Sequence, residues 1–352
     1  MSEPLSRREF LLSTAGGLAA GAALGIPHPM RPPRPLTAKR RWLAKPVVIS
    51  SKGDLRAVER ALELLMQGAD PLDAAVEGVK IAELDPNDTT VGYGGLPDAD
   101  GVVQLDASCM HGPTKRAGAV GALEGIKTPS EVAKLVLKYT NHIFLVGEGA
   151  KRFALSYGFK EENLLTEKAR QKWLQWRANL NPNDDYLDVP DSEKMVVHEP
   201  GGGTINCDAV TATGDIASVT STSGLAWKIP GRVGDSAIIG AGQYCENDVG
   251  AVGSTGRGES NIKVCGGFLT VEHMRRGMKP TDACLETLRR VVAMTESRLL
   301  NERGRPKFDL NFYAVNKRGE FGAASLYPGA KFSIHDGTRA RAEDAAALFD
   351  AR

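Results

Sequence analysis

The sequence predicts an α+β protein in which layered sheets are covered by helices. Helical spacing of apolar residues recurs in both halves of the chain, together with short β-branched runs separated by turn residues. A polar stretch rich in Asn, Asp, Pro and Gly, residues 161–203, lies between the halves and is expected to be an exposed, irregular connector. Blocks of strands and helices on either side of a connector are typical of sheets packed beneath helices.

The first half begins with a strand and a helical pair. Residues 45–50, KPVVIS, predict a short buried strand. Residues 54–84 show apolar spacing of three and four, and the sequence GADP divides them into two helices, the first with Asp54 as N-cap. Residues 91–112 predict strands joined by a tight turn at DADG. Two more helices are expected at 129–140 and 147–159.

The second half contains more strands. Residues 204–212 and 214–224 predict antiparallel strands with a turn at ATGD, and residues 309–326 predict two strands around NKRGE. Helical spacing lies between them, at 268–277 and 279–300.

Composition indicates small-molecule chemistry. The chain has 352 residues, of which 42% are hydrophobic, so it is long enough to bury a full core. Lys plus Arg (44) nearly balance Asp plus Glu (43), so the chain has almost no net charge that would attract nucleic acid or anionic lipid. The five cysteines are scattered without CxxC spacing, which argues against a zinc site or a disulfide framework but allows one incidental disulfide.

The first 45 residues predict export. Residues 1–30 join the pair Arg7 and Arg8 to an apolar Gly- and Ala-rich run, which is typical of a twin-arginine signal peptide. The run is shorter than the roughly 20 apolar residues of a membrane-spanning helix, which weighs against an anchor. Residues 31–45 are rich in Pro and Arg and predict a linker. We expect a periplasmic or secreted protein.

Common catalytic motifs do not match. Residues 250–260, GAVGSTGRGES, suggest a phosphate loop, but that signature requires Gly-Lys-Ser/Thr, and Arg257 follows Gly256 here. The chain has no G-x-S-x-G elbow and no H-E-x-x-H helix, and its six histidines are dispersed. A serine triad or a catalytic metal therefore has no support.

Three glycines, residues 201–203, precede Thr204. A threonine hydroxyl becomes a nucleophile when Thr is the first residue of a chain, because its own α-amine then acts as the base. That arrangement requires a cut between Gly203 and Thr204, and glycines permit the strained, open geometry of a self-cleaving peptide. The alternative is a flexible linker that leads into a strand.

Ordered motifs between residues 46 and 335 resemble the glycosylasparaginase family of N-terminal nucleophile hydrolases, which includes plant-type asparaginases and isoaspartyl peptidases. The resemblance lies in GYGGLPD (92–98), LDASCMHG (105–112), GRVGDSAIIGAGQY (231–244) and STGRG (254–258). It implies a four-layer αββα sandwich. It also implies an α subunit of residues 46–203 and a β subunit of residues 204–352.

The resemblance assigns roles to six residues. Thr204 matches the self-cleaving nucleophile, and Thr222 matches the threonine that hydrogen-bonds and tunes it. Arg232 and Asp235 match the pair that holds the α-carboxylate and α-amino group of the substrate, which suits a guanidinium and a carboxylate. Thr255 and Gly256 match an oxyanion hole, with one hydroxyl and one backbone N–H.

The chain departs from the family pattern at four places. Gly202 and Gly203 precede the nucleophile where the family has His-Asp or a similar polar residue, and Asn206 replaces a glycine after it. The stretch 50–52, SSK, stands where the family has NTW, and His111 stands where it has an aspartate.

The function that this resemblance implies is hydrolysis of the β-aspartyl amide bond of glycosylated asparagine through an acyl-Thr204 intermediate, as in an N4-(β-N-acetylglucosaminyl)-L-asparaginase. One alternative is an isoaspartyl peptidase or L-asparaginase of the same superfamily. A second is an exported binding protein whose loop no longer cuts. No residue suggests a cofactor, a catalytic metal, nucleic acid, or a membrane after signal removal, and the family implies a homodimer of αβ units.

Overall fold

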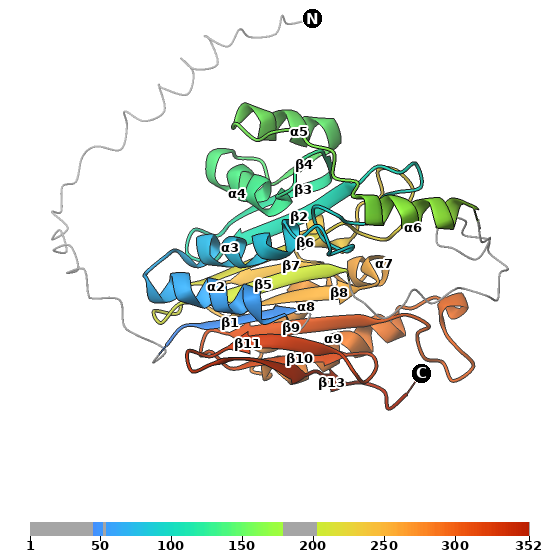
Figure 1. The fold of residues 1–352 in the computed structure, drawn as a ribbon. Helices are drawn as coiled ribbons and strands as arrows, with labels where there is room; N and C mark the ends of the chain where they lie inside the picture. The colour runs from blue at the N-terminus through green and yellow to red at the C-terminus, as the bar shows by residue number, and fades with distance from the viewer. Residues whose placement is uncertain (1–44, 52–53, 179–202, 352) are drawn as a thin grey trace, which may run out of the picture. The chain divides into compact units, whose positions relative to one another are not determined.

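The computed structural model describes residues 45–51, 54–178 and 203–351. Within these ranges the chain forms two mixed β-sheets and eight α-helices, so the predicted α+β class is confirmed (Figure 1). The predicted signal peptide, and the linker apart from Lys45, lie outside the described residues. Within the described ranges no helix is long and apolar enough to cross a membrane.

The larger sheet has eight strands in the order β12-β11-β1-β5-β6-β2-β3-β4. All neighbours are antiparallel except β3 and β4, which are parallel. In chain order its strands are β1 (Val47–Ser51), β2 (Gln104–His111), β3 (Arg116–Glu124), β4 (Phe144–Val146), β5 (Thr204–Val210), β6 (Ile216–Thr222), β11 (Lys331–His335) and β12 (Ala340–Asp344).

The smaller sheet has five strands in the order β13-β10-β9-β8-β7. Its strands are β7 (Gln243–Glu246), β8 (Gly250–Gly256), β9 (Leu310–Asn316), β10 (Phe321–Ser325) and β13 (Ala346–Ala347). Short 3-10 helices, Asp235–Ala237 and Ser297–Leu299, lie in the loops before β7 and β9.

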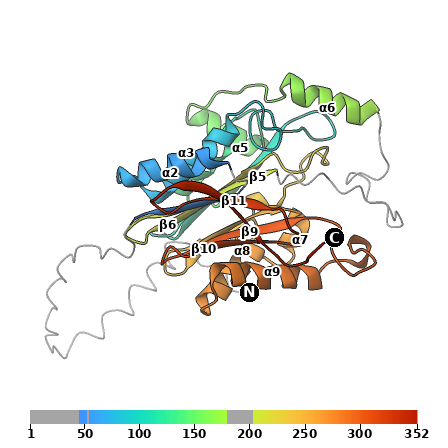
Figure 2. The ribbon, with the colours of Figure 1, turned by 60° about the horizontal axis from the view of Figure 1, so that its bottom comes forward.

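Different helices cover the two sheets. Alternate residues of β5, including Ile205, Cys207 and Ala209, share one apolar cluster with α2 and α3. The helices α8 and α9 share another cluster with β8, β9 and β10 of the smaller sheet (Figure 2). The helices are α2 (Leu55–Met66), α3 (Pro71–Glu83), α4 (Pro129–Tyr139), α5 (Gly147–Ser156), α6 (Glu167–Ala178), α7 (Gly258–Ile262), α8 (Gly266–Arg275) and α9 (Pro280–Ala293).

A third apolar cluster joins the two sheets to each other. It contains Val210 and Ile216 of the larger sheet and Ala251, Tyr313 and Val315 of the smaller one. The cluster fills one end of the space between the sheets, and buried polar residues of β5 and β6 continue from it toward Thr204 and Thr222. The first residue of β5 and the last of β6 are therefore at the opposite end of this space.

Most predicted elements are confirmed. The strand at β1, the helices α2 to α5, α8 and α9, and the hairpins β5/β6 and β9/β10 occur where the sequence predicts them. Asp54 caps α2, since its side chain accepts a hydrogen bond from Arg56 N. All five cysteines lie in the described ranges as free thiols, four of them buried.

Two predictions were wrong. Residues 91–103 form no strand, because Gly92 and Gly94 adopt positive φ angles of 59° and 102° that break an extended run. Part of the predicted irregular connector is the helix α6. Its polar residues pair along the helix, and Trp173 packs against Gly101 while Trp176 stacks on Trp227 with ring centroids 5.3 Å apart.

Candidate active site

The predicted nucleophile and its tuning threonine are direct neighbours. Thr204 opens β5 and pairs with Thr222, the last residue of β6, in antiparallel register. The Thr222 hydroxyl donates to the carbonyl oxygen of Gly203 at 2.9 Å and accepts from Gly224 N at 2.9 Å. A hydroxyl thus polarises the carbonyl of the peptide bond that joins Gly203 to Thr204.

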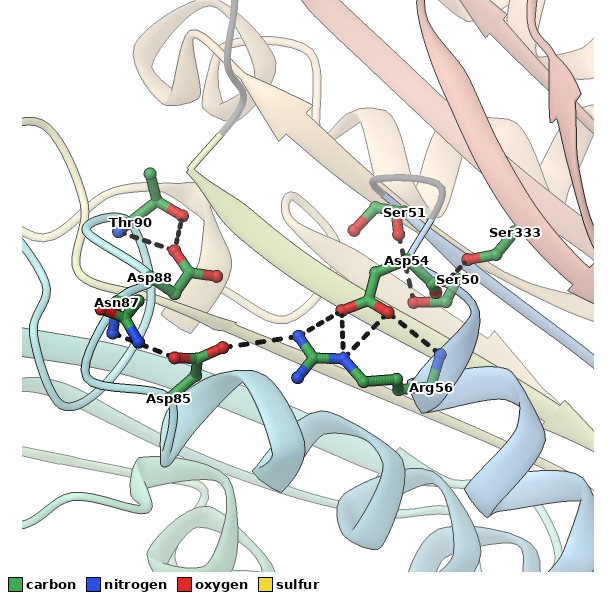
Figure 3. Close-up of polar contacts among 9 residues, drawn as sticks. All are labelled: Ser50, Ser51, Asp54, Arg56, Asp85, Asn87, Asp88, Thr90 and Ser333. Carbon is green, nitrogen blue, oxygen red and sulfur yellow. Dashed lines mark hydrogen bonds and ion pairs between the residues drawn. The ribbon is translucent and has the colours of Figure 1, made fainter.

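Gly203 lies against the loop that follows α3. A Cβ on this residue would be 3.0 Å from Thr90 Cβ, so a side chain here would crowd Thr90. Asp88 fixes Thr90 by accepting from both its backbone N–H, at 2.9 Å, and its hydroxyl. Figure 3 shows Thr90 and Asp88 near the start of β5, with Ser51 at the end of β1. A side chain at the residue before Thr204 would therefore require Thr90 to shift.

Ser50 and Ser51 of the SSK stretch hydrogen-bond to β5 beside the nucleophile. Ser51 Oγ donates to the Thr204 carbonyl at 3.0 Å and accepts from Asn206 N at 2.9 Å. Ser50 Oγ donates to the Asn206 carbonyl at 2.6 Å. Lys52 lies outside the described residues. The two serines stand where the family has Asn and Thr, and they hydrogen-bond to the strand that carries Thr204.

Asn206 fills space between the sheets. Its amide lies directly over Gly253 of β8, where a Cβ would overlap it. The amide nitrogen donates to Asp208 Oδ1 at 3.2 Å, to the Val219 carbonyl at 3.1 Å and to Thr220 Oγ1 at 3.2 Å. The glycine that the family pattern has at this position could make none of these bonds. Burial raises the pKa of the neighbouring Asp208 to about 7.

Glycines surround the guanidinium of Arg232. Added Cβ atoms would lie 2.9 Å from its Nη1 at Gly234 and 3.3 Å from the same atom at Gly224. Glu259 of α7 accepts from Arg232 Nε at 2.9 Å and from Nη2 at 2.8 Å. These glycines therefore let the backbone approach the guanidinium closely, while Glu259 holds its Nε and Nη2.

Asp235 is a buried carboxylate with two donors on one oxygen. Ser254 Oγ and Asn261 Nδ2 each donate to its Oδ2 at 2.8 Å. Its Oδ1 faces Gly258, where a Cβ would be 2.7 Å from this oxygen and 3.3 Å from Arg232 Nη2. Burial raises the pKa of Asp235, and the positive charge of an ammonium ligand would act against that rise. The predicted substrate-binding pair meets at Gly258.

Thr255 has its hydroxyl oxygen in a polar cluster of the smaller sheet. Asn311 Nδ2 donates to Thr255 Oγ1 at 3.0 Å, and Tyr313 Oη lies 2.8 Å from the same atom. Burial raises the pKa of Tyr313 to about 12, so it stays a neutral phenol that can donate. If Thr255 accepts from both groups, its own hydrogen is free for a third partner. The next residue, Gly256, has a φ of 121°, which only glycine adopts readily.

The predicted residues gather at one end of the space between the sheets. Asn206 contacts Gly253, and Cys245 Sγ of β7 contacts the Ile216 carbonyl at the far end. Cys245 pairs with Ala251, and Ile216 pairs with Val210, so the Ala251 end of β8 lies at the Val210 end of β5. The other end of β8, which carries Thr255, therefore lies toward Thr204. The alternation of a strand gives Thr204 and Asn206 the same face.

His111 lies elsewhere. It ends β2 opposite Ala217, at the other end of the sheet from Thr222. Its Nε2 lies 3.1 Å from Asp70 Oδ2 and its Nδ1 is 2.8 Å from Thr114 Oγ1. The substitution for the family's aspartate therefore stands away from the candidate active site.

Sequence reasoning missed a second group of polar residues around the site, all buried except the part-buried Asn311: Gln104, Asp106, Ser108, Lys228, Asn261, Asn311 and Tyr313. The ammonium of Lys228 donates to the carbonyls of Gln104 at 2.8 Å and Ser223 at 3.1 Å. One sequence signal was available, because QLDAS places polar residues at alternate positions of an otherwise apolar strand.

Comparison with known proteins gives a family match. The model of a family described as asparaginase matches residues 43–299. The chain is 39% identical over 335 residues to an N(4)-(β-N-acetylglucosaminyl)-L-asparaginase of Elizabethkingia miricola, which covers 94% of this chain and 92% of that protein.

Two eukaryotic relatives are also similar. The mouse N(4)-(β-N-acetylglucosaminyl)-L-asparaginase is 37% identical over 266 residues, with 70% of this chain and 77% of that protein covered. A probable isoaspartyl peptidase/L-asparaginase of Arabidopsis thaliana is 33% identical over 323 residues, with 83% and 87% covered.

Proposed function

Because this chain belongs to the asparaginase family and is a hydrolase that acts on amide bonds, we propose that it cuts itself between Gly203 and Thr204 and then hydrolyses the β-aspartyl amide of glycosylated asparagine. The observation that carries the proposal is the hydrogen bond from Thr222 to the Gly203 carbonyl oxygen, 2.9 Å long, directly before Thr204. A donor at that oxygen stabilises the negative charge that develops when the carbonyl is attacked.

The cut follows from the same contact. The Thr204 hydroxyl adds to the Gly203 carbonyl carbon, the C–N bond breaks, and the hydroxyl proton passes to the departing nitrogen. Water then hydrolyses the resulting ester, which leaves a carboxylate on Gly203 and a free α-amine on Thr204. The crowding at Thr90 supports a glycine as the residue whose carbonyl is attacked.

In turnover the new α-amine is the base. It takes the Thr204 hydroxyl proton as the oxygen adds to the side-chain carbonyl of asparagine, and the proton passes to the leaving nitrogen. Thr255 and Gly256 donate to the oxyanion. Water then hydrolyses the aspartyl ester and regenerates Thr204, so the products are aspartate and a glycosylamine.

Arg232 and Asp235 hold the amino-acid end of the substrate. A guanidinium pairs with the α-carboxylate through two parallel hydrogen bonds, and a carboxylate accepts from the α-ammonium. The meeting of both groups at Gly258 supports this role, because a ligand with both charges on one carbon requires them close together.

The leaving group distinguishes this proposal from its closest rival. Curated relatives that carry the glycosylasparaginase name support a glycosylamine. Lys52, which stands where the family has the tryptophan of NTW, favours an isoaspartyl peptidase or L-asparaginase as the second candidate. The Arabidopsis relative bears that name.

The remaining inferences concern architecture and location. We infer a four-layer αββα sandwich, with α2 and α3 on the larger sheet and α8 and α9 on the smaller one. We also infer an α subunit of residues 46–203, a β subunit of residues 204–352, and a homodimer of αβ pairs. Export by the twin-arginine route to the periplasm or medium follows from residues 1–30.

Comparative kinetics tests the substrate. Purified protein is given N4-(β-N-acetylglucosaminyl)-asparagine, β-aspartyl-leucine or asparagine, and released aspartate is measured. We expect the highest kcat/KM for the glycosylated substrate. A higher value for β-aspartyl-leucine or asparagine would favour the second candidate, and no hydrolysis of any of the three would favour a binding protein.

A further inference from the structure

The strand β2 contacts the loop that carries Arg232 and Asp235 through three side chains in a row. Gln104 Oε1 accepts from Gly231 N at 2.8 Å, and Asp106 Oδ2 accepts from Gly234 N at 3.2 Å. Ser108 Oγ donates to the Ser236 carbonyl at 2.6 Å. All three side chains are buried.

The spacing of these contacts follows from the strand. Alternate residues of a strand lie on one face and are roughly 7 Å apart, so Gln104, Asp106 and Ser108 form a rigid row. The three loop anchors enclose the two charged residues, with Arg232 between the first and second anchors and Asp235 between the second and third.

Asp106 is the central contact. Its Oδ1 accepts from Ala122 N at 2.9 Å, and Ala122 has a φ of 47°, uncommon for a residue with a side chain. The pairing of β2 with β3 shifts register beside it, between Leu105 and Ala107. The carboxylate thus joins an irregular point of the sheet to the loop, and both of its oxygens accept from backbone N–H groups.

The buried cation Lys228 bonds to the backbone of the same strand, and the charge of Asp106 opposes the lowering of its pKa by burial. Lys228 is 4% exposed, and its ammonium donates to the Gln104 carbonyl on the same strand. A Cβ on Gly224 would be 2.9 Å from Lys228 Nζ and 3.3 Å from Arg232 Nη1, so both cations border the same space.

We infer that Asp106, with Gln104 and Ser108 on either side, is a positioning residue that sets the distance between Arg232 and Asp235 and so determines selectivity for substrates with a free α-carboxylate. The inference rests on the proposed function, because it assigns these two charges to the amino-acid end of the substrate. Asp106 itself touches no reacting atom.

The test compares two chromogenic substrates, L-aspartic acid β-(p-nitroanilide) and its α-carboxamide. Wild-type protein should prefer the free acid, because only the carboxylate pairs with Arg232. In Asp106→Asn one N–H group of the new amide faces Gly234 N or Ala122 N, and the loop loses an anchor. We expect the ratio of kcat/KM for acid over amide to fall about 10- to 100-fold, since small misplacements of binding groups have effects of that size.

Asp98→Asn is the matched control. Asp98 is also fully buried and accepts from two backbone N–H groups, those of Asp100 and Val102, at 3.0 Å each. It holds a different turn, so its variant should lose stability yet keep the wild-type ratio. Ser108→Ala, which removes only one anchor, should lower the ratio by about threefold, and it decides the question if Asp106→Asn does not fold.

The outcomes separate the two proposals. A wild-type ratio retained in Asp106→Asn or, should that variant not fold, in Ser108→Ala would overturn the positioning role alone. A wild-type protein that hydrolyses neither substrate, or both equally, would overturn the proposed function and this inference with it. A ratio that falls in Asp106→Asn and stays unchanged in Asp98→Asn is the result we expect.

Discussion

The nucleophile and the substrate-binding pair are held in different ways. Thr204 and Thr222 are fixed by the backbone ladder of β5 and β6, which continues over seven residue pairs. Arg232 and Asp235 stand on a loop whose anchors to the sheet include three β2 side chains. Backbone hydrogen bonds survive most substitutions, whereas one side-chain change removes an anchor.

This difference agrees with the position of most of the described departures from the family pattern. Ser50, Ser51, Gly203 and Asn206 lie around the nucleophile, where the ladder keeps the threonines in register, while His111 lies at the other end of the sheet. The block of residues 231–236 keeps the family's GRVGDS sequence. A site held by backbone pairing tolerates new neighbours, and a site held by side chains keeps its sequence.

Loss of the nucleophile should have the largest effect. Thr204→Ala removes the attacking hydroxyl, so neither the cut nor turnover can occur, and kcat should fall on the order of 10⁶-fold. Intact mass and aspartate release measure both steps. Thr204→Ser, which keeps a hydroxyl, should retain part of each activity. Cutting or turnover in the alanine variant would show that another residue is the nucleophile.

Loss of the donor at the Gly203 carbonyl should have the next largest effect. Thr222→Val keeps the β-branched shape but removes the hydrogen bond of 2.9 Å, so the cut should slow about 10²- to 10³-fold, as with other oxyanion donors. The rate is followed by gel after refolding of uncut protein. Thr213→Val, in the turn between the same strands, serves as a control and should cut at the wild-type rate. Equal rates for both variants and the wild type would exclude this role for Thr222.

The contact between Asn206 and Gly253 should affect stability more than catalysis. Gly253→Ala places a Cβ on the Asn206 amide and should lower the free energy of unfolding by about 1–3 kcal/mol. Adding Asn206→Gly makes room for the new methyl group and should recover part of the loss. Urea unfolding of the single and double variants measures the coupling. Additive losses would mean that the two residues do not compete for the same space.

A buried carboxylate near β6 should affect neither the cut nor turnover and should be visible only as a pH dependence of stability. Glu83 accepts from Ser130 N at 3.0 Å, Ser130 Oγ at 2.8 Å and Ser221 Oγ at 2.7 Å, and burial raises its pKa from 4.5 to about 7. The folded state therefore binds more protons than the unfolded state between these values. Stability from this group should fall as pH rises from 4.5 to 7 and level off above.

Glu83→Gln removes this titration while keeping the side-chain shape. Its stability relative to the wild type should rise between pH 5 and pH 8, by up to roughly 3 kcal/mol. Urea midpoints at the two pH values give the comparison. In Asp208→Asn, too, the free energy of unfolding should fall less steeply with rising pH than in the wild type, because the pKa of Asp208 is also raised, to about 7. Parallel pH curves for wild type and Glu83→Gln would show that Glu83 does not titrate in this range.

Local features of this fold were predictable from the sequence. The turn at ATGD and the alternation on both sides of it predict a hairpin, and the hairpin alone brings Thr204 opposite Thr222. Helical spacing and an N-cap predicted α2 and α3. The helix α6 was missed because its hydrophobic contacts are with a distant loop, through Trp173 and Trp176.

Long-range contacts were not predictable. Gln104, Asp106 and Ser108 meet loop residues 127 or 128 positions away in the chain. Similarly, Asn311 and Tyr313 reach Thr255 from the neighbouring strand β9. Such pairs depend on strand order, which spacing within one segment does not determine. The roles assigned to Thr204, Thr222, Arg232, Asp235, Thr255 and Gly256 remain predictions, although these residues lie at one end of the sheets.

The first experiment should be the denatured intact mass of purified protein, with N-terminal sequencing of any fragment. The proposed masked nucleophile predicts two chains, one of which begins Thr-Ile-Asn-Cys at Thr204. A single chain that stays intact through long incubation would contradict it, and the protein would then be better described as a binding protein derived from a family of amide hydrolases.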